Sequence, residues 1–323
     1  MTPGRSCPPQ YRYAPADVGR AVAFETSCLY VVGGLYGNAL ALDSILELAR
    51  QEPEPPAIVF NGDFNWFNVD DPGFAAINSR VLAHTALRGN VETEVAGDDN
   101  AAGCGCGYPD FVSDADVERS NLIIEHLRDT ARRQPLLRRQ LAPLPMYLTA
   151  AVGASRVAIV HGDCESLAGW GLSRESLAVP DHRARVTGWF SAARVNIIAS
   201  SHSCLPILRA VAREGVTGLV ANNGAAGMPN FRNSHYGIIT RIAVRPSPHA
   251  ALYGTTVNDC HVDALPVHYD QRRWLAAFLA NWPAGSPAHD SYFRRVVAGP
   301  DYGTDDACRY QVSATPALRP IAV

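Results

Sequence analysis

Short runs of apolar, mostly β-branched residues alternate along this chain with longer segments that have one apolar face. The short runs predict buried strands, and they cover 29–32, 57–60, 157–160, 195–199 and 216–221. Two longer segments, 39–50 and 116–133, predict amphipathic helices, because their apolar residues recur every three or four positions. Strands that alternate with helices are typical of a layered α/β domain. We therefore expect an α/β fold.

The last quarter of the chain has a weaker pattern. Two runs at 238–244 and 250–253 predict a closing hairpin, and the apolar residues of 271–282 predict a last helix. The residues after this helix are rich in Pro and Gly, so we expect them to wrap the surface. The predicted organisation is a core over 1–245, with a Cys-containing insertion at about 93–115, and a C-terminal extension over 246–323 packed on the core.

The composition limits what the chain can be. It has 323 residues, of which 47% are hydrophobic and 18% charged, enough to bury a core. The net charge of −3 argues against a protein that coats nucleic acid. All 28 basic residues are Arg, which excludes a Schiff-base lysine and a P-loop lysine. The sequence has neither a membrane-spanning apolar stretch nor a signal-peptide pattern, so we expect a cytoplasmic protein.

Polar blocks follow the ends of the predicted strands. They are Gly34-Leu35-Tyr36-Gly37-Asn38, Gly62-Asp63, Gly89-Asn90-Val91-Glu92, His161-Gly162-Asp163, Ser201-His202-Ser203-Cys204, and the block from Asn222 to Pro229. In open α/β sheets, ligands bind at the carboxyl ends of the strands. Carboxylate, amide and imidazole groups together are suited to Mn, Fe or Zn. The blocks therefore predict a metal site at one edge of the fold.

The order of these blocks resembles the calcineurin-like metallophosphoesterase family. The family pattern runs Asp-x-His, Gly-Asp, Gly-Asn, His-Gly and Gly-His-x-His, and the likeness covers about 29–231. The Gly-Asn-Val-Glu block is more like the compact phosphodiesterase branch of the family. The resemblance implies a β-sandwich flanked by helices in α-β-β-α layers, with two metal ions at its edge. It also implies hydrolysis of a phosphate monoester or diester by a metal-activated water.

The resemblance implies two metal sites. At one site all the family's ligand types are present in this chain, and at the other most of them are replaced. The complete site has the ligands Asp63, Asn90, His161 and His202. In the other site, Gly34 and Tyr36 stand where the family has its first Asp and the partner His, and Cys204 stands for the final His. The altered site is either rebuilt with Tyr and Cys ligands for Fe or Zn, or lost, which leaves one metal or none. The alternatives to a hydrolase are an iron-containing redox or non-hydrolytic enzyme and a non-catalytic ligand-binding protein.

Further residues near these blocks are candidates for chemistry. Glu92 and Asp163 each follow a metal ligand by two residues, and they would act as acid–base groups or only orient ligands. We include Glu92 with the candidate catalytic residues. Cys104 and Cys106 would share a metal, form a redox pair, replace a missing ligand, or be incidental thiols of a flexible loop.

The expected substrate is a small-molecule phosphoester or a nucleotide. Arg88 precedes the Gly-Asn block and is our candidate for binding a phosphate oxygen. Trp66 and Phe67 would stack on a nucleobase or simply pack in the core. We expect no membrane partner. The sequence leaves open whether the chain forms a homo-oligomer.

Overall fold

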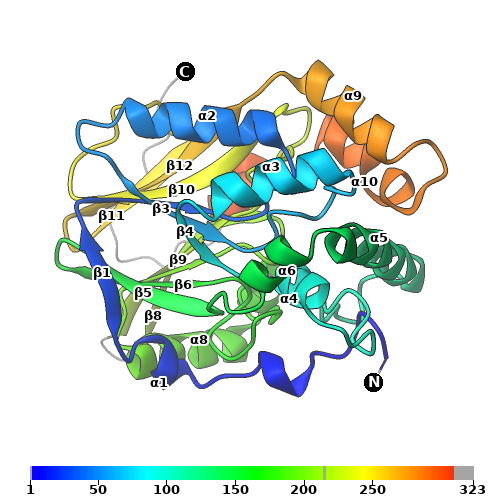
Figure 1. The fold of residues 1–323 in the computed structure, drawn as a ribbon. Helices are drawn as coiled ribbons and strands as arrows, with labels where there is room; N and C mark the ends of the chain where they lie inside the picture. Colours follow the sequence, from blue (N-terminus) through cyan, green and yellow to red (C-terminus); the bar gives the residue numbers. More distant parts are fainter. Residues whose placement is uncertain (1, 214–215, 309–323) are drawn as a thin grey trace.

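The computed structural model describes residues 2–213 and 216–308, and its strands form two six-stranded sheets packed face to face (Figure 1). The first sheet has the order β1-β5-β6-β7-β9-β8, with β1 at Val22–Thr26, β5 at Tyr147–Val152, β6 at Ser155–Val160, β7 at Ile197–Ser200, β9 at Val216–Asn223 and β8 at Pro206–Arg213. Strands β6, β7 and β9 are parallel, so their carboxyl ends meet at one edge.

The second sheet has the order β11-β12-β10-β2-β3-β4, with β11 at Tyr253–Val257, β12 at Cys260–His268, β10 at Tyr236–Ala243, β2 at Cys28–Val32, β3 at Ala57–Asn61 and β4 at Thr85–Leu87. Strands β2, β3 and β4 are parallel, and β10 runs antiparallel to both of its neighbours. The carboxyl ends of these three parallel strands carry the first three polar blocks.

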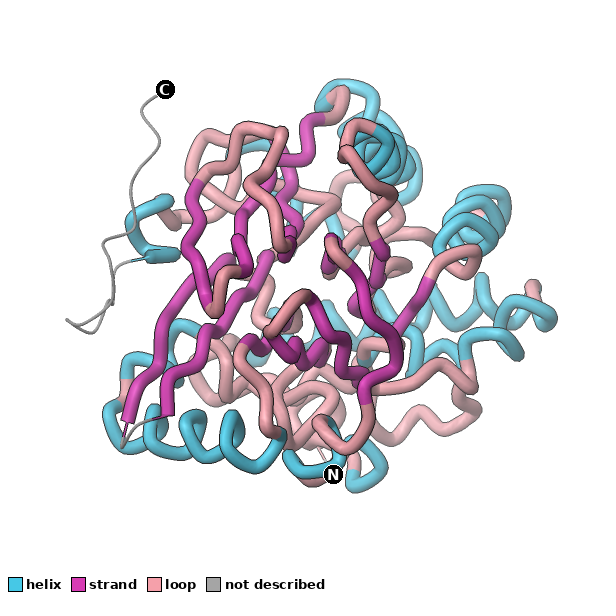
Figure 2. The backbone as a smooth tube through the Cα atoms, turned by 90° about the vertical axis from the view of Figure 1, so that its left-hand side faces the viewer, coloured by secondary structure: helices cyan, strands magenta, loops and turns pink. Residues whose placement is uncertain are grey.

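The core has three layers, because strand side chains point alternately to opposite faces. Between the sheets, Leu29 and Val59 of the second sheet pack with Val157 and Ile197 of the first. On the outer face of the second sheet, Tyr30 packs beneath helices, and α8 covers the outer face of the first sheet. Figure 1 shows α2 and α3 on one side of the sandwich and α1 and α8 on the other. In the view turned by 90°, strands fill the interior and helices surround them (Figure 2).

The helices are α1 (Pro15–Val18), α2 (Ala39–Arg50), α3 (Asp71–Val81), α4 (Asn90–Ala96), α5 (Asp114–Arg133), α6 (Pro135–Leu141), α7 (Arg174–Ala178), α8 (Pro180–Ala193), α9 (Gln271–Asn281), α10 (Pro287–Ala298) and α11 (Thr304–Cys308). The expected layered α/β sandwich is confirmed. Helix α2 has the predicted bounds because Asn38 caps it: the Asn38 side chain accepts a hydrogen bond from Ala41 N at 3.0 Å. In the part of the chain that the structure describes, no helix combines the length and apolar character needed to cross a bilayer.

The prediction for the end of the chain is partly wrong. Strand β10 does not form a hairpin with 250–253; it pairs with β12, which also pairs with β11. Strand β12, which the prediction missed, contains Pro266, a residue that is unfavourable inside most sheets. Pro266 lies beyond the end of β11. On that side of β12, no neighbouring strand needs a hydrogen bond from the backbone N–H that proline lacks. The residues after α9 form α10, which packs on α5, instead of wrapping the surface. The described part of 246–323 thus completes the second sheet and adds helices, while 309–323 lie outside the described residues.

Candidate metal centre

Asp63 lies in a tight turn directly after β3. Gly62 and Asp63 both have left-handed backbones, with φ of +77° and +54°. A Cβ at Gly62 would lie only 2.5 Å from the backbone nitrogen of Gly89, so only glycine fits. The carboxylate of Glu92 holds this turn by accepting hydrogen bonds from Asp63 N at 2.7 Å and Phe64 N at 3.0 Å. Glu92 also accepts from Gly89 N at 3.0 Å, which ties the turn to the start of α4.

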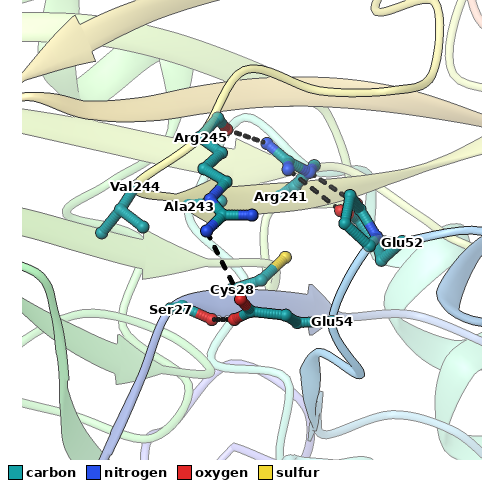
Figure 3. Close-up of a pocket in the computed structure, with 9 residues that line it drawn as sticks. Ser27, Cys28, Glu52, Glu54, Arg241, Ala243, Val244 and Arg245 are labelled. Atoms are coloured by element: carbon teal, nitrogen blue, oxygen red, sulfur yellow. Dashed lines mark hydrogen bonds and ion pairs between the residues drawn. The ribbon is translucent and has the colours of Figure 1, made fainter.

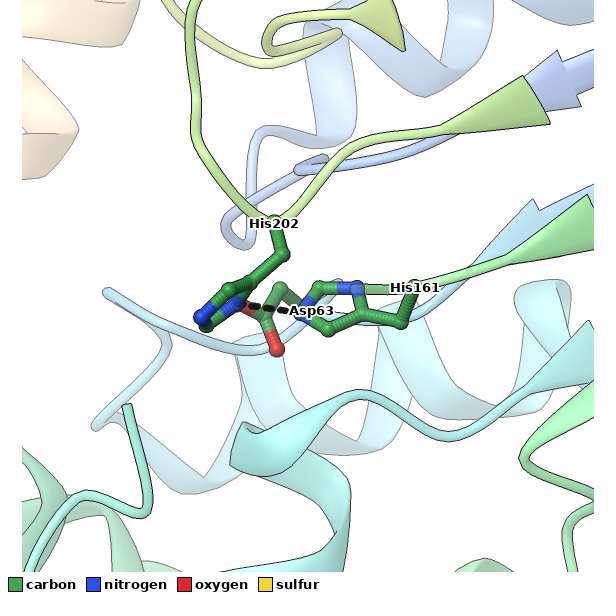
Figure 4. A group of neighbouring side chains, drawn as sticks. All are labelled: Asp63, His161 and His202. Atoms are coloured by element: carbon green, nitrogen blue, oxygen red, sulfur yellow. Dashed lines mark hydrogen bonds and ion pairs between the residues drawn. The ribbon is translucent and has the colours of Figure 1, made fainter. Parts of the chain in front are cut away.

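The two histidines follow β6 and β7, and backbone carbonyls orient both rings. His161 Nδ1 lies 2.9 Å from Asn61 O, and His202 Nε2 lies 2.8 Å from Cys106 O. A carbonyl oxygen only accepts hydrogen bonds, so each of these ring nitrogens carries the proton. In the neutral rings, the other nitrogens therefore have free lone pairs. These two atoms, His161 Nε2 and His202 Nδ1, lie 3.1 Å apart (Figure 4).

Asn90 and Asp63 direct oxygen atoms at the same point. Asn90 donates its Nδ2 to Cys104 O at 3.0 Å, which turns Oδ1 to within 3.1 Å of His161 Nε2. Asp63 Oδ2 lies 3.3 Å from the same nitrogen, and the ligand atoms of Asp63, His161 and His202 are all within 4.8 Å of one another. When His161 is neutral, lone pairs of all four residues face one another, and either a proton on His161 Nε2 or a metal ion can lie between them. A cation relieves this repulsion, and the oxygen and nitrogen donors fit Mn, Fe or Zn.

The three ionisable groups influence one another's charge, and a metal ion competes with a proton for His161. Burial opposes the ionisation of Asp63, but the neighbouring His161 and His202 outweigh it and hold the pKa of this carboxyl below its usual range. Burial also disfavours the charged form of His161, yet Asp63 raises the pKa of this imidazole above its ordinary value. Burial and the charge on His161 lower the pKa of His202 to about 4. At neutral pH, His202 is therefore a neutral ligand beside an ionised carboxylate.

In the altered half of the site, the side chains of Tyr36 and Cys204 contact each other and fill the space. The hydroxyl of Tyr36 and the thiol of Cys204 form a hydrogen bond of 2.9 Å. The Tyr36 ring folds over Gly34, and a Cβ at Gly34 would lie 2.9 Å from the ring's Cζ and hydroxyl oxygen. The phenol thus occupies the space that a carboxylate at position 34 would need. Burial, followed by the proximity of Cys204, raises the pKa of Tyr36 well above its usual value, and burial also raises that of Cys204. Both groups are neutral here.

A pocket of about 330 Å³ opens beside the ligands. Its walls are mainly aromatic, from Trp66, Tyr108, Trp170 and Tyr292, and Arg295 adds a guanidinium group. Tyr292 and Arg295 come from α10, which the sequence prediction missed. A signal for this helix was present: Ser286 and Pro287 are typical of a helix start, and later apolar residues have helical spacing.

The Cys-containing insertion packs directly against the ligands. Cys104 and Cys106 form a disulfide, and both are buried. The carbonyl oxygen of Cys104 accepts from Asn90, while that of Cys106 accepts from His202 and, at 3.0 Å, from Trp170 Nε1. These cysteines are therefore bonded to each other, and their backbone orients two of the candidate ligands.

Other residues singled out in the sequence lie behind or away from the pocket. Glu92 is fully buried behind the Asp63 turn, and burial together with the charge of Asp63 raises its pKa to about 7. Asp163 accepts backbone N–H bonds from its own loop, including Gly171 N at 3.0 Å. Arg88 donates Nη1 to Ala142 O at 3.0 Å and is not among the residues that line the pocket. The structure thus brings together the four residues of the complete site and places Tyr36 and Cys204 beside them.

A second buried charge cluster lies at the opposite end of β2 (Figure 3). Arg241 donates Nε to Glu52 Oε1 at 2.6 Å and Nη2 to Glu52 Oε2 at 3.1 Å. Its Nη1 donates to Arg245 O at 3.0 Å and lies 3.3 Å from Asp263 Oδ2. Tyr30 donates its hydroxyl to Glu52 Oε1 at 2.7 Å. In this cluster each carboxylate oxygen of Glu52 has a donor.

The paired sheets, with the candidate ligands at their common edge, form the metallophosphoesterase fold. A metallophosphoesterase from Sphaerobacter thermophilus shares this fold with a TM-score of 0.52 and 16% identity, and the alignment covers 84% of this chain and all of that one. A hypothetical protein from Pyrococcus horikoshii OT3 has a TM-score of 0.54 and 17% identity over 85% of this chain and all of its own. No family model and no curated protein sequence matches the chain. The resemblance noted in the sequence is thus confirmed at the level of the fold.

Proposed function

We propose that this protein is a metal-dependent hydrolase of small-molecule phosphoesters. The observation that carries the proposal is the convergence of lone pairs from Asp63, Asn90, His161 and His202 at the edge of a metallophosphoesterase fold. The adjacent pocket, which has room for a small organic molecule, is the proposed substrate site.

The four ligand residues would hold one Mn, Fe or Zn ion. When bound, such an ion lowers the pKa of water and polarises a phosphoryl oxygen. The chain supplies the geometry: carbonyl acceptors fix the tautomer of both histidines, and Cys104 O fixes the amide of Asn90. Glu92 acts as a positioning residue, because its carboxylate holds the backbone of Asp63.

One ion per chain is the stoichiometry that the side chains favour. Tyr36 and Cys204 are hydrogen-bonded to each other and neutral, and the Tyr36 ring fills the space above Gly34. A second ion held by these groups would require both of them to lose their protons.

The first test is elemental analysis and an absorption spectrum of the protein as purified, followed by hydrolysis of p-nitrophenyl phosphate and bis(p-nitrophenyl) phosphate. We expect about one metal ion per chain, hydrolysis that a chelator abolishes, and recovery on adding Mn, Fe or Zn. His202→Ala should lose both metal and activity, whereas His235→Ala, an exposed histidine, should keep both. Hydrolysis that persists in metal-free His202→Ala protein would refute the proposal.

An iron-containing enzyme with redox or non-hydrolytic chemistry is the second candidate. It is favoured by the contact between Tyr36 and Cys204, since phenolate and thiolate are both good ligands for iron. Two metal ions per chain and a visible charge-transfer band that Tyr36→Phe removes would support this candidate. A colourless protein with one ion would reject it.

A further inference from the structure

One cationic side chain beside the altered half of the site has no role in the function proposed above, on which the present inference rests. Arg295 of α10 lines the pocket together with Tyr36, Asp63 and Cys204. We propose that its guanidinium binds a phosphoryl oxygen on the side where the resemblance would place a second metal ion. The same pocket then selects phosphoesters that carry a planar aromatic group.

Two backbone carbonyls hold Arg295 in place. Its Nη2 donates to Cys204 O at 2.5 Å, and its Nε donates to Pro229 O at 3.2 Å. These contacts fix the plane of the guanidinium against the loop that carries Cys204. The positive charge therefore lies beside the altered half of the site.

Arg295 has no acidic partner among the described residues. Within residues 2–213 and 216–308, no carboxylate lies within 4.0 Å of this guanidinium. An arginine without an acidic partner, next to a proposed hydrolytic centre, is suited to an anionic oxygen. It does this without the deprotonation that a second metal would impose on its ligands.

The rest of the pocket indicates what the phosphate is attached to. Trp66 and Tyr292 form an edge-to-face pair, with ring centroids 6.4 Å apart, and Tyr108 and Trp170 form a tilted pair at 5.8 Å. All four line the pocket, together with Leu205. Flat aromatic walls favour a planar aromatic group, such as an aryl ring or a nucleobase, through stacking. An aliphatic phosphoester would gain less from these walls.

The test of the anion site compares Arg295→Gln with Arg294→Gln, its exposed neighbour on the same helix. The metal content of both should equal that of the wild type. For Arg295→Gln, we expect weaker binding of inorganic phosphate to the metal-loaded protein by calorimetry. We also expect a loss of about 100-fold in kcat/KM on p-nitrophenyl phosphate, which is typical of removing one group that stabilises the transition state. Arg295→Lys should fall between, because it keeps the charge but not the fork of donors.

The outcomes separate this inference from the proposed function. If wild-type protein binds phosphate through Arg295 but hydrolyses no phosphoester, the anion site stands and the hydrolase proposal fails. If Arg295→Gln keeps wild-type phosphate affinity and kcat/KM, the anion site is refuted and the hydrolase proposal stands.

The aromatic preference has its own test, the ratio of kcat/KM for phenyl phosphate to that for glycerol phosphate. Tyr292→Leu should reduce the ratio about tenfold, the loss expected for one stacking contact. Tyr236→Leu, a half-buried tyrosine that packs on His268 and does not line the pocket, should leave it unchanged. An unchanged ratio in Tyr292→Leu would refute the aromatic preference.

Discussion

The second sheet has a buried charge cluster at each end, and the two clusters differ in how their charges are satisfied. At the amino end of β2, the carboxylate of Glu52 receives donors from Arg241 and Tyr30, so the protein closes the cluster itself. At the carboxyl ends, lone pairs of His161 and His202 face each other and the oxygens of Asp63 and Asn90. Burial of polar groups normally requires partners. The closed cluster therefore serves the fold, while the open one is built for a cation.

This difference shows why burial alone does not identify a functional site. Both clusters contain buried carboxylates with lowered pKa values, Glu52 and Asp63. What separates them is the partner. Glu52 is paired with an arginine, which stays charged, whereas Asp63 faces two histidines, which can exchange a proton for a metal ion.

The largest effect on stability is expected from breaking the closed cluster. Arg241→Met leaves the carboxylate of Glu52 buried beside Tyr30 without its main partner. We expect the free energy of unfolding to fall by about 3–5 kcal/mol, the usual cost of removing one member of a buried ion pair. Denaturant unfolding measures this, with Glu52→Leu/Arg241→Met as the control that should recover most of the loss. A single variant as stable as wild type would show that the pair is not a structural element.

The open cluster should respond to metal instead. A metal ion at 100 times its Kd should stabilise the wild type by about 2.7 kcal/mol, because it binds only the folded state. Asp63→Asn should lose this increment, whereas Asp71→Asn, whose carboxylate lies on the surface with Arg133, should keep it. Thermal unfolding with and without chelator checks both. An increment that survives in Asp63→Asn would place the metal elsewhere.

The sequence predicts features that a short local block marks, and it does not predict contacts between residues that are far apart along the chain. The candidate ligands Asp63, Asn90, His161 and His202 could be predicted because their blocks follow strands in the order that resembles the metallophosphoesterase family, and parallel strands bring their ends together. The pairing of Tyr36 with Cys204 could not, because it joins residues 168 positions apart through side-chain packing alone.

The sequence prediction missed a helix and a buried ion pair, each for its own reason. Helix α10 lies in a segment whose Pro and Gly content favours irregular structure, although Ser286 and Pro287 mark its start. Missing this helix also meant missing Arg295. The Glu52–Arg241 pair links the end of α2 to β10, and no periodicity in either segment indicates such a contact.

A smaller effect should appear in acid. Burial opposes the ionisation of Glu52, but hydrogen bonds from Arg241 and Tyr30 outweigh it and hold the pKa of this carboxyl below 4.5. A lowered carboxyl pKa adds stability above the unfolded-state value, and this stability is lost as the pH falls through the folded-state value. Below pH 4.5, the wild type should therefore lose more unfolding free energy than Glu52→Leu/Arg241→Met. Equal slopes, measured by denaturant unfolding at each pH, would contradict the role assigned to the closed cluster.

The smallest expected effect concerns the loop that orients the open cluster. Carbonyl oxygens of Cys104 and Cys106 accept from Asn90 and His202, and the disulfide shortens the loop between them. Without that link, the carbonyls gain freedom and the ligands lose their fixed orientation. Cys104→Ser/Cys106→Ser should therefore bind metal about 10-fold more weakly, the lower end for loss of an outer partner of a ligand. Competition with a chelating dye measures this, and Cys308→Ser, a free thiol on α11, is the matched control. If affinity does not change, the backbone alone holds the loop, and the disulfide has no part in presenting acceptors to the open cluster.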